Sequence, residues 1–397
     1  MTFSRRSSFD PRPNALTLAL DRARSRERQQ GPAVLDLTVS NPTEAGIPYD
    51  AERILSALAD PRALVYEPHS FGLWRAREAV AREVSALAGR PVDPDHVVLT
   101  ASTSEAYAFL LKLLCDPGDE VLVPQPSYPL FEHLGAFEAV RLVPYPLAYD
   151  GAWHIDLDGL RRAIGPRARA VLVVNPNNPT GSFLKRQELA ALAALGLPIV
   201  SDEVFASYVL TGDSARTRSV LEADGASGAL LFSMGGLSKL AGLPQMKAAW
   251  TVVAGPEPLR REALARLELI ADTFLSVGTP VQHALPTLLA TRASAHDAIA
   301  QRTKRNLETL RAALTQAESP ATLLRVEGGW YATLRLPRTR TEETWVLDLL
   351  ENDSVYVHPG AFFEFPEEAF IVLSLLTPEP TFAEGITRLI NHAAAGH

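Results

Sequence analysis

The chain has 397 residues, of which 47% are hydrophobic, and its formal net charge is −8 at pH 7. This length is enough for a large core and for two or three domains. The negative charge argues against nucleic acid and anionic membrane surfaces as partners. No apolar run approaches the roughly 20 residues that a membrane-spanning helix needs, so we expect no membrane association.

Cysteine content and the N-terminus bear on the cellular compartment. Cys115 is the only cysteine, which rules out an internal disulfide and a multi-cysteine metal site, and we expect no bound metal. The N-terminus is rich in arginine but lacks the apolar core of a secretion signal. Asp10, Asp21 and Glu27 also interrupt its positive charge, unlike in a transit peptide. We therefore expect a cytoplasmic protein.

The first quarter of the chain contains signals for helices and one short strand. Residues 1–13 are predicted to form a loose arm, followed by Asn14 as a candidate N-cap. The amphipathic pattern predicts a helix from about Ala15 to Arg28, and Val34–Val39 is predicted to be a strand. Further helices are predicted around 51–59 and 73–88.

From residue 96 onward, short and continuously apolar strands alternate with helices. This alternation is typical of a mostly parallel sheet that helices cover on both faces. Ligands of such sheets bind beyond the carboxyl ends of the strands. The strands are predicted at 96–100, 120–123, 141–143, 170–174, 197–200, 229–233 and 248–253, and the helices at 104–114 and 185–195.

After about residue 256 the pattern changes to long helices followed by a few strands. Two helical stretches are predicted, then three strands and two further helices, which together suggest an α+β unit. We expect a large α/β domain at residues 48–290 and a smaller α+β domain formed by 1–47 and 291–397. The predicted elements are helices 258–290 and 294–317, strands 330–336, 354–357 and 369–375, and helices at 343–351 and from about 382.

One glycine-rich stretch, Ser233–Lys247, follows a predicted buried strand and holds Lys239 between Ser238 and Leu240. Desolvation disfavours the ammonium form, lowers the pKa of the amine and makes it a nucleophile toward an aldehyde. A solvated lysine in a surface loop explains this stretch equally well when it is considered alone.

Other predicted strands also end in polar or aromatic side chains. Two Asn-Pro units make a rigid turn around Asn178, and Asp202 directly follows a buried strand, where it needs a partner such as a protonated ring nitrogen. Thr100–Ala106 is a strand-to-helix junction of small hydroxyl residues whose free N–H groups would hold a phosphate. Tyr128, between Ser127 and Pro129, would stack on a planar ring. Taken singly, these features are also explained by an ordinary turn, a simple N-cap and a core tyrosine.

Together these groups fit pyridoxal phosphate, which has a phosphate, a phenolic oxygen, a ring nitrogen and an aldehyde. The chain resembles the class I/II, fold-type I aminotransferases from about residue 35 to its C-terminus. The matching stretches occur in the family's order and are Tyr66–Ala79, Thr100–Ala106, Pro126–Pro129, Asn175–Gly181, Asp202-Glu203, Ser238-Lys239, Gly328–Tyr331 and Val357–Gly360.

The resemblance implies a fold-type I architecture, with a large α/β/α domain on a mostly parallel sheet, and pyridoxal 5′-phosphate as cofactor. It implies that Lys239 forms the internal aldimine and shuttles the proton between substrate and cofactor. Asp202 would keep the pyridine nitrogen protonated, Asn178 would bind the phenolic oxygen, and Tyr128 would stack on the ring.

The resemblance also implies residues for the phosphate and for the substrates. Tyr66 would reach the phosphate of the neighbouring subunit, which makes a homodimer with shared sites the expected assembly. The substrates would be a small-molecule amino donor and a carbonyl acceptor. The candidate phosphate-binding residues are Ser102, Thr103, Ser104, Ser238 and Lys247, and the candidate substrate-binding residues are Ser40, Asn41, Asn178 and Arg335.

Three positions depart from the family's pattern around the cofactor. Phe205 replaces a tyrosine that donates to the phenolic oxygen, and we expect a raised aldimine pKa as a consequence. Gly236 replaces a phosphate-binding serine, and Ser233 or Ser238 would compensate for it. Lys247 replaces an arginine, which keeps the charge but loses the bidentate geometry.

A fourth departure concerns the substrate. Val372 occupies the position of the arginine that grips the substrate α-carboxylate in the family, so this bidentate contact is absent. Either another cation replaces it, with Arg335 and His358 as candidates, or the substrate is not an ordinary α-amino acid. The sequence leaves both interpretations open.

The leading functional hypothesis is a pyridoxal-phosphate-dependent aminotransferase. A β-lyase or a decarboxylase that uses the same cofactor is an alternative, because Lys239, Asp202 and Asn178 serve these reactions equally well. A non-catalytic cofactor-binding module is a third hypothesis, against which Lys239 is intact and no basic helix-turn-helix segment is attached.

Overall fold

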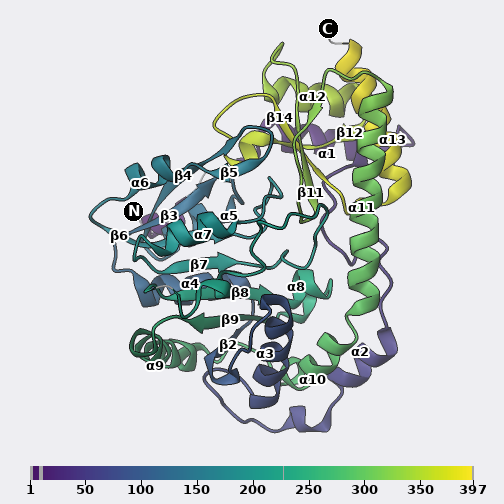
Figure 1. Cartoon of the computed structure of the whole chain (residues 1–397). Helices are drawn as coiled ribbons and strands as arrows, with labels where there is room; N and C mark the ends of the chain where they lie inside the picture. The colour runs from purple at the N-terminus through teal and green to yellow at the C-terminus, as the bar shows by residue number, and fades with distance from the viewer. Residues whose placement is uncertain (1–2, 9–11, 227, 396–397) are drawn as a thin grey trace.

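The computed structural model describes residues 3–8, 12–226 and 228–395 of the chain. A mixed eight-stranded sheet forms the centre of the molecule, in the order β2-β9-β8-β7-β6-β3-β4-β5 (Figure 1). The strands are β2 (Val97–Thr100), β3 (Glu120–Gln125), β4 (Arg141–Tyr149), β5 (Trp153–Ile155), β6 (Ala168–Val174), β7 (Ile199–Asp202), β8 (Leu231–Gly236) and β9 (Ala249–Ala254). The pairings among β8, β7, β6, β3 and β4 are parallel, which confirms the predicted mostly parallel sheet.

Helices cover both faces of this sheet because its central strands are apolar on both sides. In β6, Val171 and Val173 pack into one core, whereas Ala170, Leu172 and Val174 pack into another. This follows from the alternation of side chains along a strand. The first core contains residues of α3 (Trp74–Ala88), α6 (Leu157–Ala163), α7 (Arg186–Ala193) and α10 (Thr279–Ala290), and the second those of α4 (Thr103–Leu114), α5 (Leu130–Phe137) and α9 (Glu257–Phe274).

The C-terminal part builds a second, smaller sheet with its own core. Its order is β10-β11-β14-β13, and all of its pairings are antiparallel. The strands are β10 (Thr322–Leu323), β11 (Tyr331–Arg335), β13 (His358–Pro359) and β14 (Phe370–Ser374). The helices of this part are α11 (Ala293–Gln316), α12 (Glu342–Asp353) and α13 (Glu379–Ala395).

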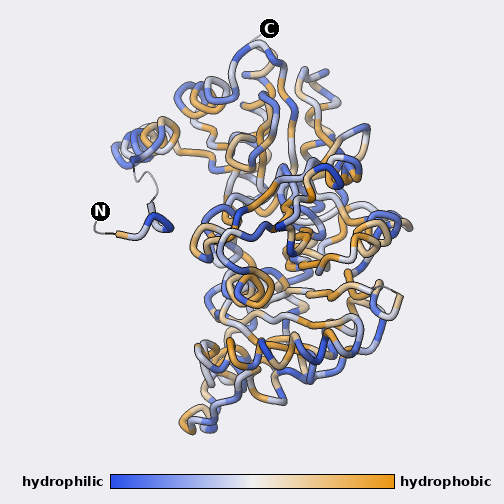
Figure 2. Tube along the Cα trace, turned by 90° about the vertical axis from the view of Figure 1, so that its left-hand side faces the viewer, coloured by the Kyte–Doolittle hydropathy of each residue, from blue (hydrophilic) through white to orange (hydrophobic). Residues whose placement is uncertain are grey.

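The N-terminal segment packs against this smaller part. β1 (Leu35–Asp36) pairs in parallel with β12 (Val355–Tyr356), and Leu37 is buried in the core that α11 and α13 share. α1 (Ala15–Arg28) packs on α12 at the margin of the molecule (Figure 2). These contacts support the proposed division into a large domain of 48–290 and a small domain of 1–47 and 291–397.

Several predicted elements have the predicted bounds, and one long helix does not. Asn14 caps α1 as predicted, because its Oδ1 accepts a hydrogen bond from the backbone N–H of Thr17 at 2.8 Å.

The predicted continuous helix 258–290 is wrong, since the chain turns at Leu275, with φ at 43°, and starts α10 at Thr279. The predicted strand Val34–Val39 is reduced to β1. The α2 helix (Ala51–Leu58) was predicted, whereas α5, α6 and β5 were not.

None of the helices in the described ranges combines the length and the apolar character needed to cross a bilayer.

We predict that Leu37→Ala destabilises the protein by about 2–5 kcal/mol, because Leu37 is 0% exposed and its loss leaves a cavity in the small-domain core. The control is Leu269→Ala on α9, where the side chain is 73% exposed and the change should stay within about 0.5 kcal/mol. Urea unfolding followed by tryptophan fluorescence measures both. Equal stability of the two variants would show that the N-terminal segment does not belong to this core.

Candidate active site

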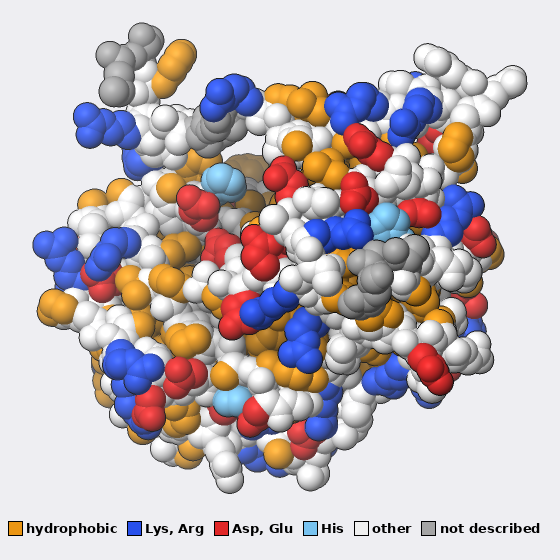
Figure 3. Space-filling view, turned by 90° about the horizontal axis from the view of Figure 1, so that it is seen from above, with side chains coloured by type: hydrophobic (Ala, Val, Ile, Leu, Met, Phe, Trp, Pro, Cys, Tyr) orange, Lys and Arg blue, Asp and Glu red, His pale blue; other side chains and the backbone are white. Residues whose placement is uncertain are grey.

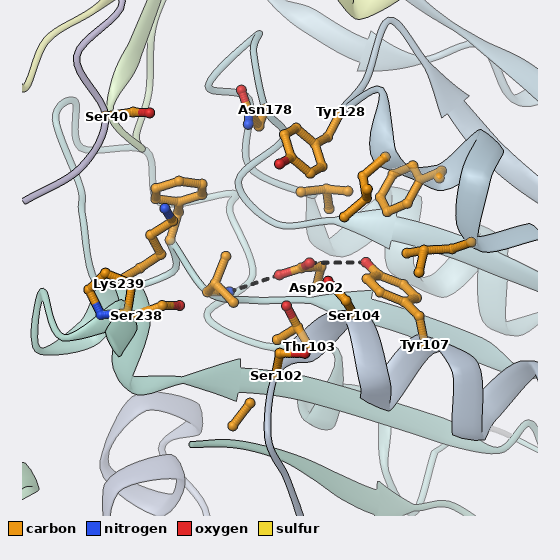
Figure 4. Close-up of a pocket in the computed structure, with 18 of the residues that line it drawn as sticks. Ser40, Ser102, Thr103, Ser104, Tyr107, Tyr128, Asn178, Asp202, Ser238 and Lys239 are labelled. Carbon is orange, nitrogen blue, oxygen red and sulfur yellow. Dashed lines mark hydrogen bonds between the residues drawn. The ribbon is translucent and has the colours of Figure 1, made fainter. Parts of the chain in front are cut away.

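A cavity of about 430 Å³ lies beyond the carboxyl ends of β6 and β7, and small-domain residues line part of its wall. This volume lies within the range of small-molecule sites. Figure 4 shows Ser102 and Thr103 on one side of Asp202, and Asn178 and Tyr128 on the other. The cavity thus brings together residues from several strand ends, as expected for an open sheet of this kind.

Lys239 lies on α8 (Leu237–Leu240), the short helix that directly follows β8. Burial lowers the pKa of its amine from 10.5 to about 8, and the attraction of Asp202 opposes this shift only in part. The Nζ atom lies 5.0 Å from the ring centre of Trp330 and 5.5 Å from that of Phe205. The Tyr208 hydroxyl donates to the backbone carbonyl of Lys239 at 2.7 Å and so fixes the helix. The alternative of a solvated loop lysine is therefore wrong.

Asp202 is the last residue of β7, and its carboxylate is held from two directions. Oδ2 accepts a hydrogen bond from the Tyr107 hydroxyl at 3.0 Å, and Oδ1 accepts one from the Val204 N–H at 3.2 Å. Burial raises the pKa of Asp202, while these two hydrogen bonds and the nearby Lys239 lower it. A cationic ring nitrogen in the cavity would supply the compensation that a buried carboxylate requires.

Ser102, Thr103 and Ser104 line the cavity where α4 begins. The Ser102 hydroxyl accepts a hydrogen bond from the Glu105 N–H at 3.2 Å, so it is a true N-cap. The first-turn N–H groups of Thr103 and Ser104 have no partner within the helix, and such groups bind anions. The N-cap and the anion site therefore coexist at this junction.

The cation at this end of the cavity is Lys247. The antiparallel pairing of β2 with β9 sets Thr100 opposite Ala249, which brings Lys247 close to the turn at Ser102. Its side chain is exposed and makes no hydrogen bond or ion pair with the other described residues. Lys247 therefore supplies a free positive charge beside the start of α4.

The structure explains why residue 236 is a glycine. It also shows which of Ser233 and Ser238 can replace the missing phosphate-binding serine. A Cβ at Gly236 would lie 3.2 Å from the Cβ of Ala249, which is tighter than usual. Ser233 is not a substitute, because its hydroxyl donates to the buried carboxylate of Glu203 at 2.7 Å and does not line the cavity. Ser238 does line it.

Asn178 and Tyr128 form the wall opposite the serines. The Oδ1 atom of Asn178 is buried and has no hydrogen-bond partner among the described residues. A buried polar atom without a partner is unusual, so this amide is suited to a polar ligand in the cavity. Tyr128 is not a core residue, because its side chain is 42% exposed. Its ring meets the ring of Phe131 edge-on, with the ring centres 6.4 Å apart.

The candidate substrate-binding residues have different locations. Ser40 lines the cavity, but Asn41 closes its own turn, where its Oδ1 accepts from the Thr43 N–H at 3.1 Å. Arg335 is exposed at the end of β11 opposite to Tyr331 and does not line the cavity. Of the two cations proposed to replace the family arginine, only His358 lines the cavity.

Tyr66 lies outside this cavity. Its side chain is 75% exposed, and it lines a separate, smaller cavity together with residues of the turn before α10. Its predicted contact with a neighbouring subunit stays a prediction.

Sequence reasoning assigned no site role to two tyrosines that line the cavity. Tyr107 follows Thr103 by four residues, so helical periodicity sets both on one face of α4 and could have revealed it. Tyr331 enters from β11, and Ser40 forms a hydrogen bond with it. No local signal connects Tyr331 to the strand ends of the large sheet, because the contact arises from packing of the small domain.

Comparison with known proteins agrees with this geometry. The model of the family described as "Aminotransferase class I and II" matches residues 32–388. The chain belongs to the class I and II aminotransferases. It is 28% identical to the glutamate-pyruvate aminotransferase AlaA of Escherichia coli K12, over 86% of this chain and 85% of that protein. It is 30% identical to an alanine aminotransferase of Mycobacterium tuberculosis, over 92% of this chain and 87% of that protein.

Solved structures of aminotransferases have the same fold. An alanine aminotransferase from Pyrococcus furiosus superposes with a TM-score of 0.86 over 99% of this chain and 100% of that chain, at 24% identity, which shows the fold alone. A double mutant of Thermus thermophilus aspartate aminotransferase gives a TM-score of 0.82 at 26% identity, over 98% and 99% of the two chains. This aminotransferase therefore has the fold-type I architecture and depends on pyridoxal phosphate.

The residues present fit that cofactor. The amide of Asn178, whose Oδ1 has no partner among the described residues, the buried amine of Lys239 and the buried carboxylate of Asp202 lie in the same cavity. The Nδ2–H group of this amide can donate to a phenolic oxygen. The start of α4 and Lys247 add a place for a phosphate.

We predict that cofactor incorporation into the protein freed of cofactor has a rate that rises with pH around a midpoint near 8. Only the neutral amine attacks the aldehyde, and burial lowers the pKa of Lys239 to about 8. Stopped-flow absorbance across neutral and alkaline pH measures the rate.

Two variants control this measurement. Lys239→Ala should develop no visible band, whereas Lys247→Ala should keep the midpoint and need more cofactor for saturation. A midpoint at the ordinary lysine pKa, or a persistent band in Lys239→Ala, would contradict the assignment.

Proposed function

We propose that this aminotransferase moves an amino group between an amino donor and a keto acid or other carbonyl acceptor, with Lys239 as its catalytic residue. The observation that carries this proposal is the pair formed by the Lys239 amine and the Asp202 carboxylate, which line one cavity from neighbouring strand ends. When bound, pyridoxal phosphate supplies an aldehyde and an electron-accepting ring. Lys239 then accepts a proton from the substrate carbon and returns it to the cofactor carbon.

The remaining roles follow from the positions of the side chains. Asp202, held by Tyr107 and Val204, keeps the ring nitrogen protonated. The Asn178 amide binds the phenolic oxygen, and Phe205 brings no hydroxyl to the same region. Tyr128 stacks on the ring.

The phosphate is held where α4 begins. Backbone N–H groups and hydroxyls of Ser102, Thr103 and Ser104 supply hydrogen bonds, and Ser238 adds a hydroxyl from α8. Lys247 supplies the charge, but its ammonium is a point charge and does not form the planar fork of an arginine. This combination holds the phosphate with less geometric specificity than an arginine would.

We also propose a homodimer with shared sites. Leu64 is 91% exposed and Tyr66 75% exposed, so an apolar segment remains uncovered in the single chain. A second copy that covers this segment would bring Tyr66 to the phosphate of the other subunit.

The expected solution mass is therefore twice the 43.1 kDa of the chain, measured by light scattering coupled to size-exclusion chromatography. A Leu64→Asp variant, with a charge in the segment, should shift the mass toward that of one chain. The mass of one chain for the unmodified protein would contradict the dimer.

Small molecules are the proposed partners, and the cytoplasm is the proposed location. Lysine and arginine side chains intermingle with aspartate and glutamate on the face seen from above (Figure 3), which does not favour a polyanion. The single cysteine, Cys115, fits a reducing compartment.

The direct test is a panel of amino donors and carbonyl acceptors that is read at the cofactor's absorbance. We expect donors to convert the cofactor to its aminated form and acceptors to restore the original band. Release of pyruvate and ammonia without a carbonyl acceptor would indicate a β-lyase, and release of carbon dioxide with an amine a decarboxylase. A spectrum that no donor changes would contradict transamination.

A further inference from the structure

The two ends of the active-site cavity differ in charge and polarity. At one end Ser102, Thr103, Ser104 and Ser238 lie near Lys247, whose position next to Ser102 is set by the pairing of Thr100 with Ala249. This is the end to which the phosphate is assigned. With the phosphate there, Lys247 would pair with it and would not be free for a substrate.

The other end is formed by the small domain and α5, and it is aromatic and apolar. Its lining residues are Tyr331, His358, Phe362, Phe363, Leu130 and Leu134. The only basic side chain in this group is His358, which stacks on Phe362 at 5.0 Å. Burial lowers the pKa of His358 to about 4, so its imidazole is neutral at pH 7.

The sheet behind this end is apolar at Val372, which pairs with the cavity-lining His358. Val372 on β14 lies directly between Thr333 and His358 on the flanking strands, so the three side chains share one face. That face points toward the large domain, because the Thr333 hydroxyl donates to the carbonyl of Pro179, the neighbour of Asn178, at 3.5 Å. Val372 is fully buried with Phe363 and Trp153.

A substrate carboxylate at this end would therefore be desolvated without a cationic partner from the described part of this chain. Such an uncompensated charge is strongly disfavoured, whereas an alkyl or aryl group gains from the same surface. The neutral imidazole of His358 and the hydroxyl of Tyr331 suit a neutral polar atom at most.

We propose that the specific substrate of this enzyme is a primary amine with an apolar chain and no carboxylate on the carbon that bears the amino group. This inference rests on the proposed transamination. In the donor half-reaction, amine and pyridoxal phosphate give the aldehyde of the amine and pyridoxamine phosphate. The C–H bond of the donor carbon breaks, Lys239 carries the proton, and water supplies the oxygen of the aldehyde. The donor is oxidised and the cofactor is reduced by the same electron pair.

The test compares amines with the amino acids that differ from them only by the carboxylate. The pairs are ethylamine and alanine, pentylamine and norleucine, and 2-phenylethylamine and phenylalanine. The holoenzyme is mixed with each compound, the loss of the visible band gives the second-order rate constant, and trapping of the aldehyde or keto acid identifies the product. We expect the amine to exceed its amino acid by at least about tenfold in the best pair.

The outcomes separate the inference from the proposed function. Amino acids that react as fast as their amines, or faster, overturn the inference and leave transamination intact, since a cation from elsewhere must then bind the carboxylate. If no member of any pair changes the cofactor, transamination fails and the inference fails with it.

Binding of unreactive ligands gives a readout that is independent of turnover. Hexanoate and hexanamide have nearly the same shape and differ in charge, and calorimetry with the holoenzyme compares them. We expect hexanamide to bind at least as tightly as hexanoate. Hexanoate that binds tenfold more tightly would overturn the inference.

A variant pair tests the position that sets the preference. Val372→Arg should shift the ratio of the norleucine rate to the pentylamine rate upward by about tenfold or more, because it adds a cation to the apolar face. Val372→Leu, which keeps the face apolar, should leave the ratio within about threefold. An unchanged ratio in a Val372→Arg protein that still binds the cofactor would contradict the role of Val372. The wild-type comparisons decide the inference if that variant does not fold.

Discussion

The burial of one amine and one carboxylate in the same cavity is the constraint on which the rest of this structure depends. Neither Lys239 nor Asp202 keeps its ordinary pKa there, because each has lost water that the protein replaces only in part. A molecule with an aldehyde and a basic ring nitrogen satisfies both groups at once. The Asn178 amide suits the phenolic oxygen of that molecule, and the start of α4 suits its phosphate.

Both the large sheet and the C-terminal part of the chain hold this arrangement. The parallel pairing of β7 with β8 brings Asp202 and the segment before Lys239 to one edge of the sheet. Tyr208 then fixes the Lys239 backbone, while its ring stacks on His296 at 4.7 Å and meets Trp330 edge-on at 5.2 Å. Lys239, the proposed catalytic residue, is therefore positioned by α11 and the segment before β11 as well as by its own strand. Residues of the smaller sheet also line the apolar end of the cavity, so the same packing would set both the proposed reactivity and the proposed substrate preference.

The sequence was sufficient for the strands of the large sheet other than β5 and for the central groups of the site. Strands buried on both faces are apolar throughout, and Lys239, Asp202 and Asn178 each follow such a run, so their convergence could be predicted. Sequence alone could not choose between Arg335 and His358, because both belong to a second sheet whose docking depends on long-range packing. The break between α9 and α10 was missed, since apolar periodicity continues across residues 275–278. Tyr107 was missed although its helical spacing from Thr103 was available.

The most direct test is to reduce the cofactor-loaded protein with borohydride, digest it and locate the attached group by mass spectrometry. The account predicts one pyridoxyl group, on the peptide that contains Lys239, and a loss of that label when Asp202→Asn weakens the hold on the ring. A label on Lys247 or on any other lysine, or no label in protein that shows the visible band, would contradict the central claim.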